Sequence, residues 1–477
     1  MSAHCGYVVK VEKLRPHSNA DRLQIATFFG NDTCVGLDVV EGEIGIYFPS
    51  DLQLSEEFCD ENHMCRKRAD GTPDTGYLER DKRNVKAIRL RGEKSDGIFV
   101  PLQAVLYTGV SIEDLEVGQT IDVLNGHEIC RKYIPRRNHR QGHVTEGNKT
   151  RKKKVDVAPL FAEHADTEQL AYNLSAFKPG DEIEITLKMH GTSQRTGYLP
   201  VFKGYHDSIW HRAYNWIADL ESLITRKECE HKHGKSIYDW GYVSGTRRTV
   251  LENYDGGYYG SNEFREQHSK IFEGKLWKGE TVYYEVVGFT HTGAPIMAEG
   301  NNEKLGKDFV KQYGKTTVFS YGCRPLGLDM NVSYFEGNVE EGIVKEYPQS
   351  DIYVYRMTMT NEDGAVVEYT PDFMRYRCEQ MGVKTVPVFA RFILHDYDLE
   401  MDDRSPGEIA KDVAERYYDG PDPIGKTHVR EGVVVRILNR PKFCAYKHKN
   451  FSFKVIENII KDAAIEPDME ESQEIVE

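Results

Sequence analysis

Residues 188–193 read Lys188-Met189-His190-Gly191-Thr192-Ser193 and directly follow a β-like run, Glu184-Ile185-Thr186-Leu187. The pattern predicts that the lysine lies where a strand ends and a turn begins. A lysine amine held there can act as a nucleophile, and we expect the glycine three residues later to let a phosphate approach the backbone. The stretch is therefore suited to the covalent transfer of a nucleotidyl group.

The Lys-x-x-Gly pattern alone is weak evidence for this chemistry. It also occurs at Lys94-Ser95-Asp96-Gly97 and at Lys311-Gln312-Tyr313-Gly314. Average lysine and glycine usage predicts about two such matches by chance in a chain of this length. The prediction for Lys188 therefore depends on the residues that follow it.

The composition is that of a globular protein. The chain has 477 residues, of which 39% are hydrophobic and 29% charged, and this length predicts two to three domains. We find no apolar run long enough to span a bilayer and no charged-then-apolar leader at the N-terminus. The nine cysteines are scattered without a C-x-x-C pair, which favours reduced thiols and a cytoplasmic location.

Charge is distributed unevenly along the chain. The formal net charge is −14, but Arg131 to Lys154 contains ten Lys or Arg residues and one acidic residue, Glu146. Such a stretch can bind phosphates, because screening limits the reach of distant acidic charge to about 10 Å. A solvated linker that its charges keep extended is an equal alternative.

The sequence pattern predicts an α+β protein in four segments. Short alternating segments over residues 1–128 predict a small OB-like β-barrel, and 129–157 form a basic linker. Within the barrel, Pro16 to Leu23 resembles the first turn of OB-fold tRNA-binding modules, although an Asn- and Asp-rich turn needs no ligand. Residues 158–465 mix helices with strands typical of antiparallel sheets. One helix is expected within 205–226 and another from Ser405 to Tyr418, after a Ser-Pro start, and Gly432 to Ile437 is one of the expected strands. Residues 466–477 form an acidic tail.

Four downstream segments carry side chains suited to nucleotide chemistry. Arg247 follows a glycine turn and could hold ribose or phosphate oxygens. Glu285 and Glu431 each accompany an apolar strand, where a buried acid needs a partner. Lys447 and Lys449 lie on one face of a strand at period-two spacing, which suits an anionic phosphate.

The order and spacing of these segments resemble the five-motif signature of covalent nucleotidyltransferases, from about Phe161 to Glu457. The His-Gly-Thr form of the lysine motif resembles the ATP-dependent, nick-sealing RNA ligases, including the Deinococcus-type branch with an N-terminal OB-like module. Flanking residues extend the resemblance: His164-x-Asp166-Thr167-Glu168 and Phe451-Ser452-Phe453-Lys454. It implies an antiparallel, ATP-grasp-like ligase domain.

The resemblance also implies a mechanism. Lys188 would attack the ATP α-phosphate and carry AMP, which would pass to an RNA 5′-phosphate and leave when an RNA 3′-hydroxyl seals the nick or break. Lys447 and Lys449 would neutralise phosphate charge. Glu431 would organise Mg²⁺ or Mn²⁺.

The remaining site residues follow from the same motif positions. Glu285 and Arg247 would contact the ribose or phosphate, Gly191 would lie beside the nucleotide, and His190 matches a position important to catalysis. An aromatic residue of the strand around 352–357 would stack on adenine, and Tyr355 is preferred over Tyr353. Family members often carry glutamate before the nucleophile, where this chain has Leu187, so the preference for ATP over GTP needs another source.

Alternatives remain at this stage. Lys94 fits the generic DNA-ligase nucleophile pattern, and Glu341-Gly342-Ile343-Val344-Lys345 mimics the second acidic motif, but neither is followed by the remaining motifs. A DNA ligase or capping guanylyltransferase normally carries a further OB domain after the lysine pair, and only 450–477 remain here. The non-enzymatic alternative is an RNA-binding protein with an inactive transferase fold.

Overall fold

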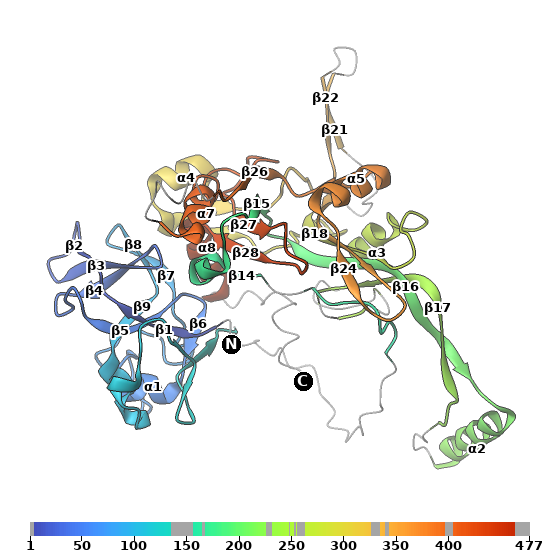
Figure 1. Cartoon of the computed structure of the whole chain (residues 1–477), viewed down its shortest axis with the longest axis horizontal. Coiled ribbons are helices and arrows are strands. Elements are labelled where there is room, and N and C mark those ends of the chain that lie inside the picture. Colours follow the sequence, from blue (N-terminus) through green and yellow to red (C-terminus); the bar gives the residue numbers. More distant parts are fainter. Residues whose placement is uncertain are drawn as a thin grey trace.

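The structure, a computed structural model, describes most of the chain (Figure 1). The described ranges are 4–134, 156–164, 167–225, 231–247, 249–251, 254, 263–325, 334–338, 343–395 and 404–462. Most of the predicted basic linker, the acidic tail and the start of the 341–345 motif lie outside these ranges. Within them, no helix combines the length and apolar character that a membrane crossing requires.

The N-terminal region is built from small antiparallel sheets. Its largest sheet has the order β10-β1-β5-β9, and β2, β3 and β4 form a second sheet. The strands and the helix of this region are β1 (Gly6–Lys10), β2 (Leu14–Pro16), β3 (Leu23–Phe28), β4 (Asn31–Gly36), β5 (Ile44–Phe48), β6 (Leu52–Leu54), α1 (Glu56–Glu61), β7 (Ala87–Leu90), β8 (Glu93–Asp96), β9 (Ile98–Pro101), β10 (Thr120–Ile121), β11 (Val123–Leu124), β12 (His127–Glu128) and β13 (Cys130–Lys132).

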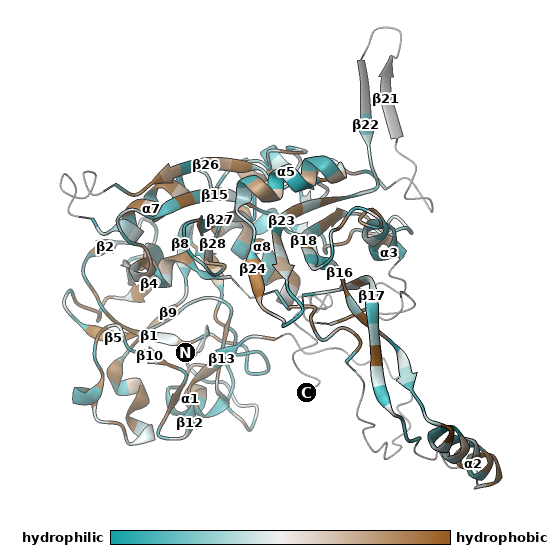
Figure 2. Ribbon diagram, turned by 45° about the vertical axis from the view of Figure 1, so that its right-hand side comes forward, coloured by the Kyte–Doolittle hydropathy of each residue, from teal (hydrophilic) through white to brown (hydrophobic). Residues whose placement is uncertain are grey.

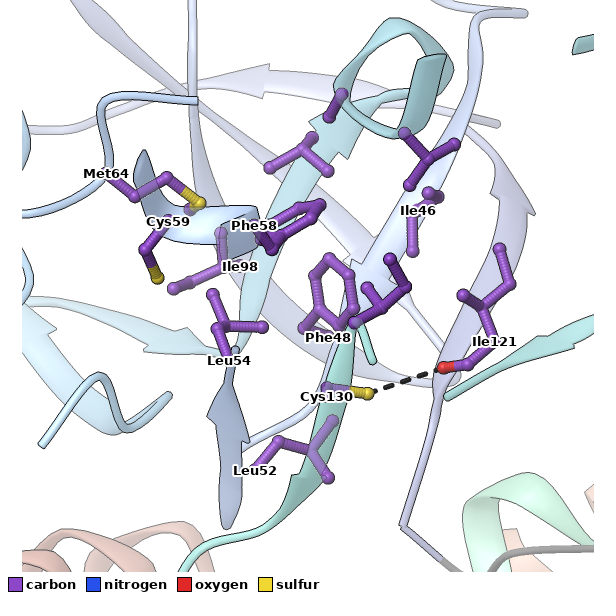
Figure 3. Packing of buried hydrophobic residues seen from close by; sticks show 14 of the residues in the cluster. Ile46, Phe48, Leu52, Leu54, Phe58, Cys59, Met64, Ile98, Ile121 and Cys130 are labelled. Carbon is purple, nitrogen blue, oxygen red and sulfur yellow. Dashed lines mark hydrogen bonds between the residues drawn. The ribbon is translucent and has the colours of Figure 1, made fainter. Parts of the chain in front are cut away.

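The predicted OB-like barrel is not confirmed, because these residues form separate sheets and hairpins with no closed barrel among them. Alternation of apolar and polar residues predicts which face of a strand is buried, but it does not specify which edges pair. A buried cluster instead joins the largest sheet to the β6–β13 pair and to α1, with Phe48 and Phe58 packed edge to face at its centre (Figure 3). At its rim the Cys130 thiol donates a hydrogen bond to the Ile121 carbonyl over 3.3 Å.

Two larger sheets form the rest of the molecule. The first, in the order β14-β28-β27-β15-β26, consists of β14 (Glu168–Gln169), β28 (Ala445–Lys449), β27 (Gly432–Ile437), β15 (Glu182–Lys188) and β26 (Val388–Ile393). The second has the order β17-β16-β18-β23-β24, with β25 (Lys384–Thr385) also paired to β23. Its other strands are β17 (Lys235–Gly245), β16 (Thr192–His206), β18 (Glu280–Gly288), β23 (Ser350–Thr360) and β24 (Val366–Glu368). Both sheets are mainly antiparallel, which confirms the predicted α+β class.

Helices cover these sheets. Helix α7 (Pro406–Glu415) starts at the predicted Ser-Pro pair with a capping box, in which Ser405 and Glu408 satisfy each other's backbone N–H groups. It buries Ala410 and Ala414 against the apolar side chains of β15 and β27. The other helices are α2 (Ile209–Thr225), α3 (Glu263–Lys270), α4 (Lys307–Tyr313), α5 (Pro371–Met381) and α8 (Phe451–Asp462). The short strands are β19 (Gly300–Asn301), β20 (Thr316–Thr317), β21 (Tyr334–Asn338), β22 (Ile343–Tyr347) and β25 (Lys384–Thr385).

The N-terminal region is docked on the two-sheet region through α8. Lys454 of α8 forms an ion pair with the buried Asp96 at 2.6 Å, and the Lys94 ammonium lies 5.4 Å from the centre of the Phe451 ring. A second contact is the stacking of Tyr7 on Tyr172 at 4.7 Å between ring centres. One face of α8 therefore belongs to an interface between the two regions.

Strands β16 and β17 extend beyond their sheet. Only Thr192 to Gly197 of β16 pair with β18, whereas the pairing with β17 continues to His206. The two strands thus leave the body of the molecule as a ribbon that carries α2 at its tip (Figures 1 and 2). Helix α2 confirms the helix predicted within 205–226.

Candidate active site

The lysine motif joins the two large sheets. Strand β15 of the first sheet ends at Lys188, and β16 of the second sheet begins at Thr192. Met189 is buried in the core between the sheets, so the short connection is anchored while the Lys188 side chain keeps 22% of its surface exposed. The predicted position of the lysine at a strand end is confirmed.

Gly191 is required by packing against β18. A Cβ atom at this position would lie 2.4 Å from the Val286 carbonyl oxygen and 2.8 Å from Cγ of Glu285. The Gly191 N–H instead donates a hydrogen bond to Oε1 of Glu285 over 3.1 Å. Close backbone packing therefore accounts for the glycine, a role that we had not expected from the sequence.

Glu431 lies at the centre of the charged groups. Its Oε1 atom is 2.7 Å from Nζ of Lys188 and 3.7 Å from Nζ of Lys449, and its Oε2 atom is 3.7 Å from Nδ1 of His190. The strand register explains this convergence, because Lys188, Gly432 and Lys449 are direct neighbours across β15, β27 and β28. The structure therefore brings three of the predicted site residues, Lys188, His190 and Lys449, around a fourth, Glu431, whose side chain is 2% exposed.

The glycine after this carboxylate makes the close strand contact possible. Gly432 has φ +149°, and a Cβ atom there would lie 2.1 Å from the His448 carbonyl oxygen and 2.8 Å from Cα of Lys449. A larger residue would push β28 away from β27 and carry Lys449 with it. The Glu-Gly pair therefore places the acid and the second lysine within reach of each other.

His190 is held in an apolar enclosure. Its ring meets Phe319 and Phe453 edge to face, at 4.5 and 4.8 Å between ring centres. Its backbone N–H donates a hydrogen bond to the Tyr321 hydroxyl over 2.6 Å. Burial lowers the pKa of His190 to about 4, although the Glu431 carboxylate acts in the opposite direction. The imidazole is therefore neutral at physiological pH.

The lysine pair lies on one face of β28. Lys447 is opposite Val434 of β27, and Lys449 also forms an ion pair with Glu457 of α8 at 2.8 Å. Glu457 was not predicted from the sequence. An acidic residue eight positions after a Lys-x-Lys pair, on the helix that follows its strand, is the signal that could have identified it.

The second sheet carries the remaining predicted residues. Glu285 of β18 is opposite Ser193 of β16 and Tyr353 of β23. The Tyr355 hydroxyl is 2.9 Å from Oγ of Ser193, whereas Tyr353 is buried in the core at 5% exposure. Only Tyr355 thus lies at the surface of the sheet near the lysine motif.

Arg247 follows the end of β17, where its carbonyl oxygen accepts a hydrogen bond from the His164 N–H over 3.2 Å. The fully buried Arg195, which was not predicted from the sequence, fixes this corner. It donates to the carbonyl oxygens of Thr246 at 2.9 Å and Phe161 at 2.8 Å. An arginine as the one charged residue of 192–202, the run next to the lysine motif, was the available signal.

A divalent cation fits this site at one atom. Oε2 of Glu431 is buried and has no hydrogen-bond partner among the described residues. In the same part of the chain, no three His, Cys, Asp or Glu side chains gather as a ready-made metal cluster. Mg²⁺ commonly binds one or two carboxylates and completes its shell with water and substrate phosphates, so a single free carboxylate oxygen meets the requirement.

Comparisons with known proteins identify the fold. No family model and no curated protein matches the chain. Among solved structures, the chain is similar to a Naegleria gruberi RNA ligase with PPi, at 14% identity and a TM-score of 0.50, over 94% of this chain and 97% of the other. A glutamate-to-alanine variant of that ligase with ATP and Mn matches at 14% identity and a TM-score of 0.50, over 94% and 98% of the two chains. The chain therefore shares an RNA ligase fold, and the Deinococcus-type branch is not confirmed.

Proposed function

We propose that this protein is an ATP-dependent RNA ligase that acts through a covalent lysyl-AMP intermediate. The observation that carries the proposal is the cluster of Lys188, His190 and Lys449 around the buried Glu431. Support comes from the fold, which is shared with an RNA ligase solved with ATP and Mn. Both features extend the sequence resemblance, which rests on motif order alone.

The first step would load the enzyme. Nζ of Lys188 attacks the α-phosphorus of ATP, a P–N bond forms, and the bond to the β-phosphate oxygen breaks to release pyrophosphate. An ammonium group has no lone pair, so the lysine must first lose a proton. Oε1 of Glu431 lies 2.7 Å away, within reach to accept that proton or to orient the amine.

Charge compensation would come from the lysine pair and a metal ion. Lys447 and Lys449 would contact the phosphate oxygens, on which negative charge accumulates in the transition state. Oε2 of Glu431 would hold Mg²⁺ or Mn²⁺, and the cation, when bound, would neutralise phosphate charge. The neutral His190 adds no positive charge, so its role would be to hold the site open and ordered.

The second sheet would bind the nucleoside. Glu285 and Arg247 would contact the ribose or α-phosphate, and Tyr355, whose hydroxyl is 2.9 Å from Oγ of Ser193, would stack on the base. Leu187 is 2% exposed in the core and is therefore unsuited to contact the base. Selection of adenine would then rest on backbone groups or on the surroundings of Tyr355.

Two further steps would complete ligation. The AMP group passes from Lys188 to the 5′-phosphate of an RNA strand, which forms a pyrophosphate linkage and frees the lysine. The 3′-hydroxyl of the adjoining strand then attacks the RNA phosphate, and AMP leaves. Nicks or breaks in duplex or structured RNA are the proposed substrates.

The decisive experiment is self-adenylylation. The protein is incubated with Mn²⁺ or Mg²⁺ and ATP labelled at the α-phosphate, and a labelled band of 54.7 kDa is expected. The Lys188→Ala variant should remain unlabelled, whereas the matched Lys94→Ala variant should label like the wild type. An unlabelled wild type would favour an inactive nucleotidyltransferase fold, and stronger labelling by GTP would place the chain with guanylyltransferases.

A further inference from the structure

The β16–β17 ribbon presents a helix whose apolar side is turned outward. In most amphipathic helices of globular proteins the polar side faces water and the apolar side faces the protein. In α2 the polar side faces the ribbon: the Asn215 side chain both donates to the Lys232 carbonyl and accepts from the Lys232 N–H, at 2.9 and 2.8 Å. Ala218 on this side is buried, at 5% exposure.

The outward side carries large apolar residues. Five of its residues follow the alternating spacing of four and three that is typical of a helix-pairing seam: Ile209, Ala213, Trp216, Leu220 and Leu223. A second row, Trp210, Ile217 and Ile224, runs beside the seam. Trp210 is 84% exposed and Leu223 is 81% exposed, and the tip of the ribbon lies away from the rest of the molecule (Figure 2).

The seam is complementary to itself when two copies run antiparallel about Trp216. Ile209 then lies opposite Leu223 of the second copy, Ala213 lies opposite Leu220, and the two Trp216 rings meet at the axis. In the neighbouring row Trp210 faces Ile224. Each apolar residue therefore meets an apolar residue, as a two-fold interface requires.

The charges beside the seam match the same alignment. Arg212 and Asp219 both lie on the flank opposite the Trp210 row, and they are seven residues apart. Antiparallel pairing about Trp216 brings Arg212 of one copy beside Asp219 of the other, twice in each pair of helices. Parallel pairing would instead place Arg212 and Asp219 of one copy beside the apolar Trp210 row of the other, so the opposite charges would not meet.

Competing occupants fit the helix less well. A helix that binds an anionic membrane surface is rich in Lys and Arg on its polar face, whereas α2 carries one of them, Arg212, against the acidic Asp219 and Glu221. The exposed apolar side chains of α2 amount to roughly 800 Å² per copy, which is the area that each partner of a standard interface buries. A second copy can thus cover this face without help from another protein.

We propose that the protein forms a two-fold dimer through antiparallel pairing of its α2 helices at the tips of two ribbons. The dimer holds two separate catalytic units, because α2 lies at the far end of the ribbon from β15, β27 and β28, the strands of the Lys188 cluster (Figure 1). Ligase chemistry in each unit is independent of the pairing. The inference does not rest on the proposed function.

A charge exchange tests the pairing. Molar mass is measured for the full chain by light scattering after size-exclusion chromatography, over concentrations from about 1 to 100 µM. The wild type should reach the dimer mass. Arg212→Asp and Asp219→Arg should each weaken association about tenfold or more, because each places like charges together twice. The double exchange, Arg212→Asp with Asp219→Arg, should restore the dimer.

A second variant and two outcomes make the test decisive. Trp216→Glu at the axis should give a monomer that still labels Lys188 with AMP at the wild-type rate. A wild-type protein that stays monomeric over the whole range would overturn the proposal, and so would a dimer that all three single variants leave unchanged. Monomeric protein that sediments with vesicles of anionic phospholipid would assign the helix to a membrane surface instead.

Discussion

Two Lys-x-x-Gly stretches of this chain have the same pattern and opposite surroundings. Lys94 is exposed on β8, over the ring of Phe451, and Asp96 two residues later is bound by Lys454. Lys188 ends β15 beside a buried carboxylate, with Lys449 close to the same carboxylate. The motif letters therefore do not define a nucleophile. We propose that the carboxylate 2.7 Å from the Lys188 amine, with Lys449 beside it, does.

Helix α8 lies between these two stretches and contacts both. Its Phe451 and Lys454 meet the hairpin of Lys94 and Asp96, whereas its Phe453 meets His190 and its Glu457 binds Lys449. The Lys94 stretch thus docks the N-terminal region on α8, whereas the Lys188 stretch contributes its lysine to the charged cluster around Glu431. The expectation from the sequence that Lys94 is not the nucleophile stays a prediction, which the docking contact supports.

Exchange of each lysine for arginine is the largest expected contrast. Lys188→Arg keeps the positive charge but replaces the amine with a guanidinium, which is always protonated and is a poor nucleophile. We expect it to lose self-adenylylation completely, whereas Lys94→Arg keeps the wild-type rate. Gel detection of the labelled protein checks both, and equal labelling of the two variants would contradict the distinction.

Neutralising the central carboxylate should have the next largest effect. Glu431→Gln keeps the shape of the side chain but removes the charge next to Lys188 and the free oxygen proposed for the metal. We expect the rate of self-adenylylation to fall on the order of 10³-fold. Glu457→Gln is the matched control on α8, with a fall of about tenfold or less, because Glu457 pairs with Lys449 and forms no ion pair with Lys188 among the described contacts. Indistinguishable rates for the two variants would remove Glu431 from the centre of the site.

Breaking the docking contact should reduce stability more than chemistry. Lys454→Met leaves the carboxylate of Asp96, which is 3% exposed, without its cation. An uncompensated buried charge costs on the order of 3 kcal/mol in the free energy of unfolding. Urea unfolding would measure this loss, and adenylylation by the folded variant should stay within about threefold of wild type. Stability equal to wild type would show that Asp96 is not buried against α8.

The smallest predicted effect is an acid sensitivity of the folded state. Burial lowers the pKa of His190 to about 4, so between about pH 6.5 and 4 the unfolded chain binds a proton there that the folded protein does not. Stability from this residue is complete above that range and is lost as the pH falls. From about pH 7.5 to 5 the loss is about 2 kcal/mol. Urea unfolding checks this: over the same pH interval the free energy of unfolding of His190→Gln should fall by about 2 kcal/mol less than that of the wild type. An equal fall in both proteins would contradict the buried neutral imidazole.

Much of the two-sheet fold could be predicted from local patterns. The run 432–437 is a strand with the predicted bounds, and the Ser-Pro start of α7 was apparent from its capping residues. Lys188, Glu431 and Lys449, which follow one another in the predicted motif order, also lie close together in the structure, because β15, β27 and β28 are adjacent strands. Periodicity identifies such elements because each has its own buried face.

Contacts between distant segments were not predictable in the same way. The N-terminal strands were identified one by one, but a barrel was inferred where the structure shows separate sheets. Nothing near Asp96 in the sequence indicates Lys454, and the outward apolar face of α2 has the same periodicity as a face turned inward. Periodicity gives the faces of an element, and the partner of each face depends on the tertiary structure.

The most direct test of the central claim is to locate the AMP. Wild-type protein is incubated with ATP and Mn²⁺, digested, and its peptides are examined by mass spectrometry for the mass increment of one AMP. The account predicts the adduct on the peptide that contains Lys188, through nitrogen and labile in acid. An adduct on the peptide of Lys94 or of Lys311, or no adduct on any lysine, would contradict it.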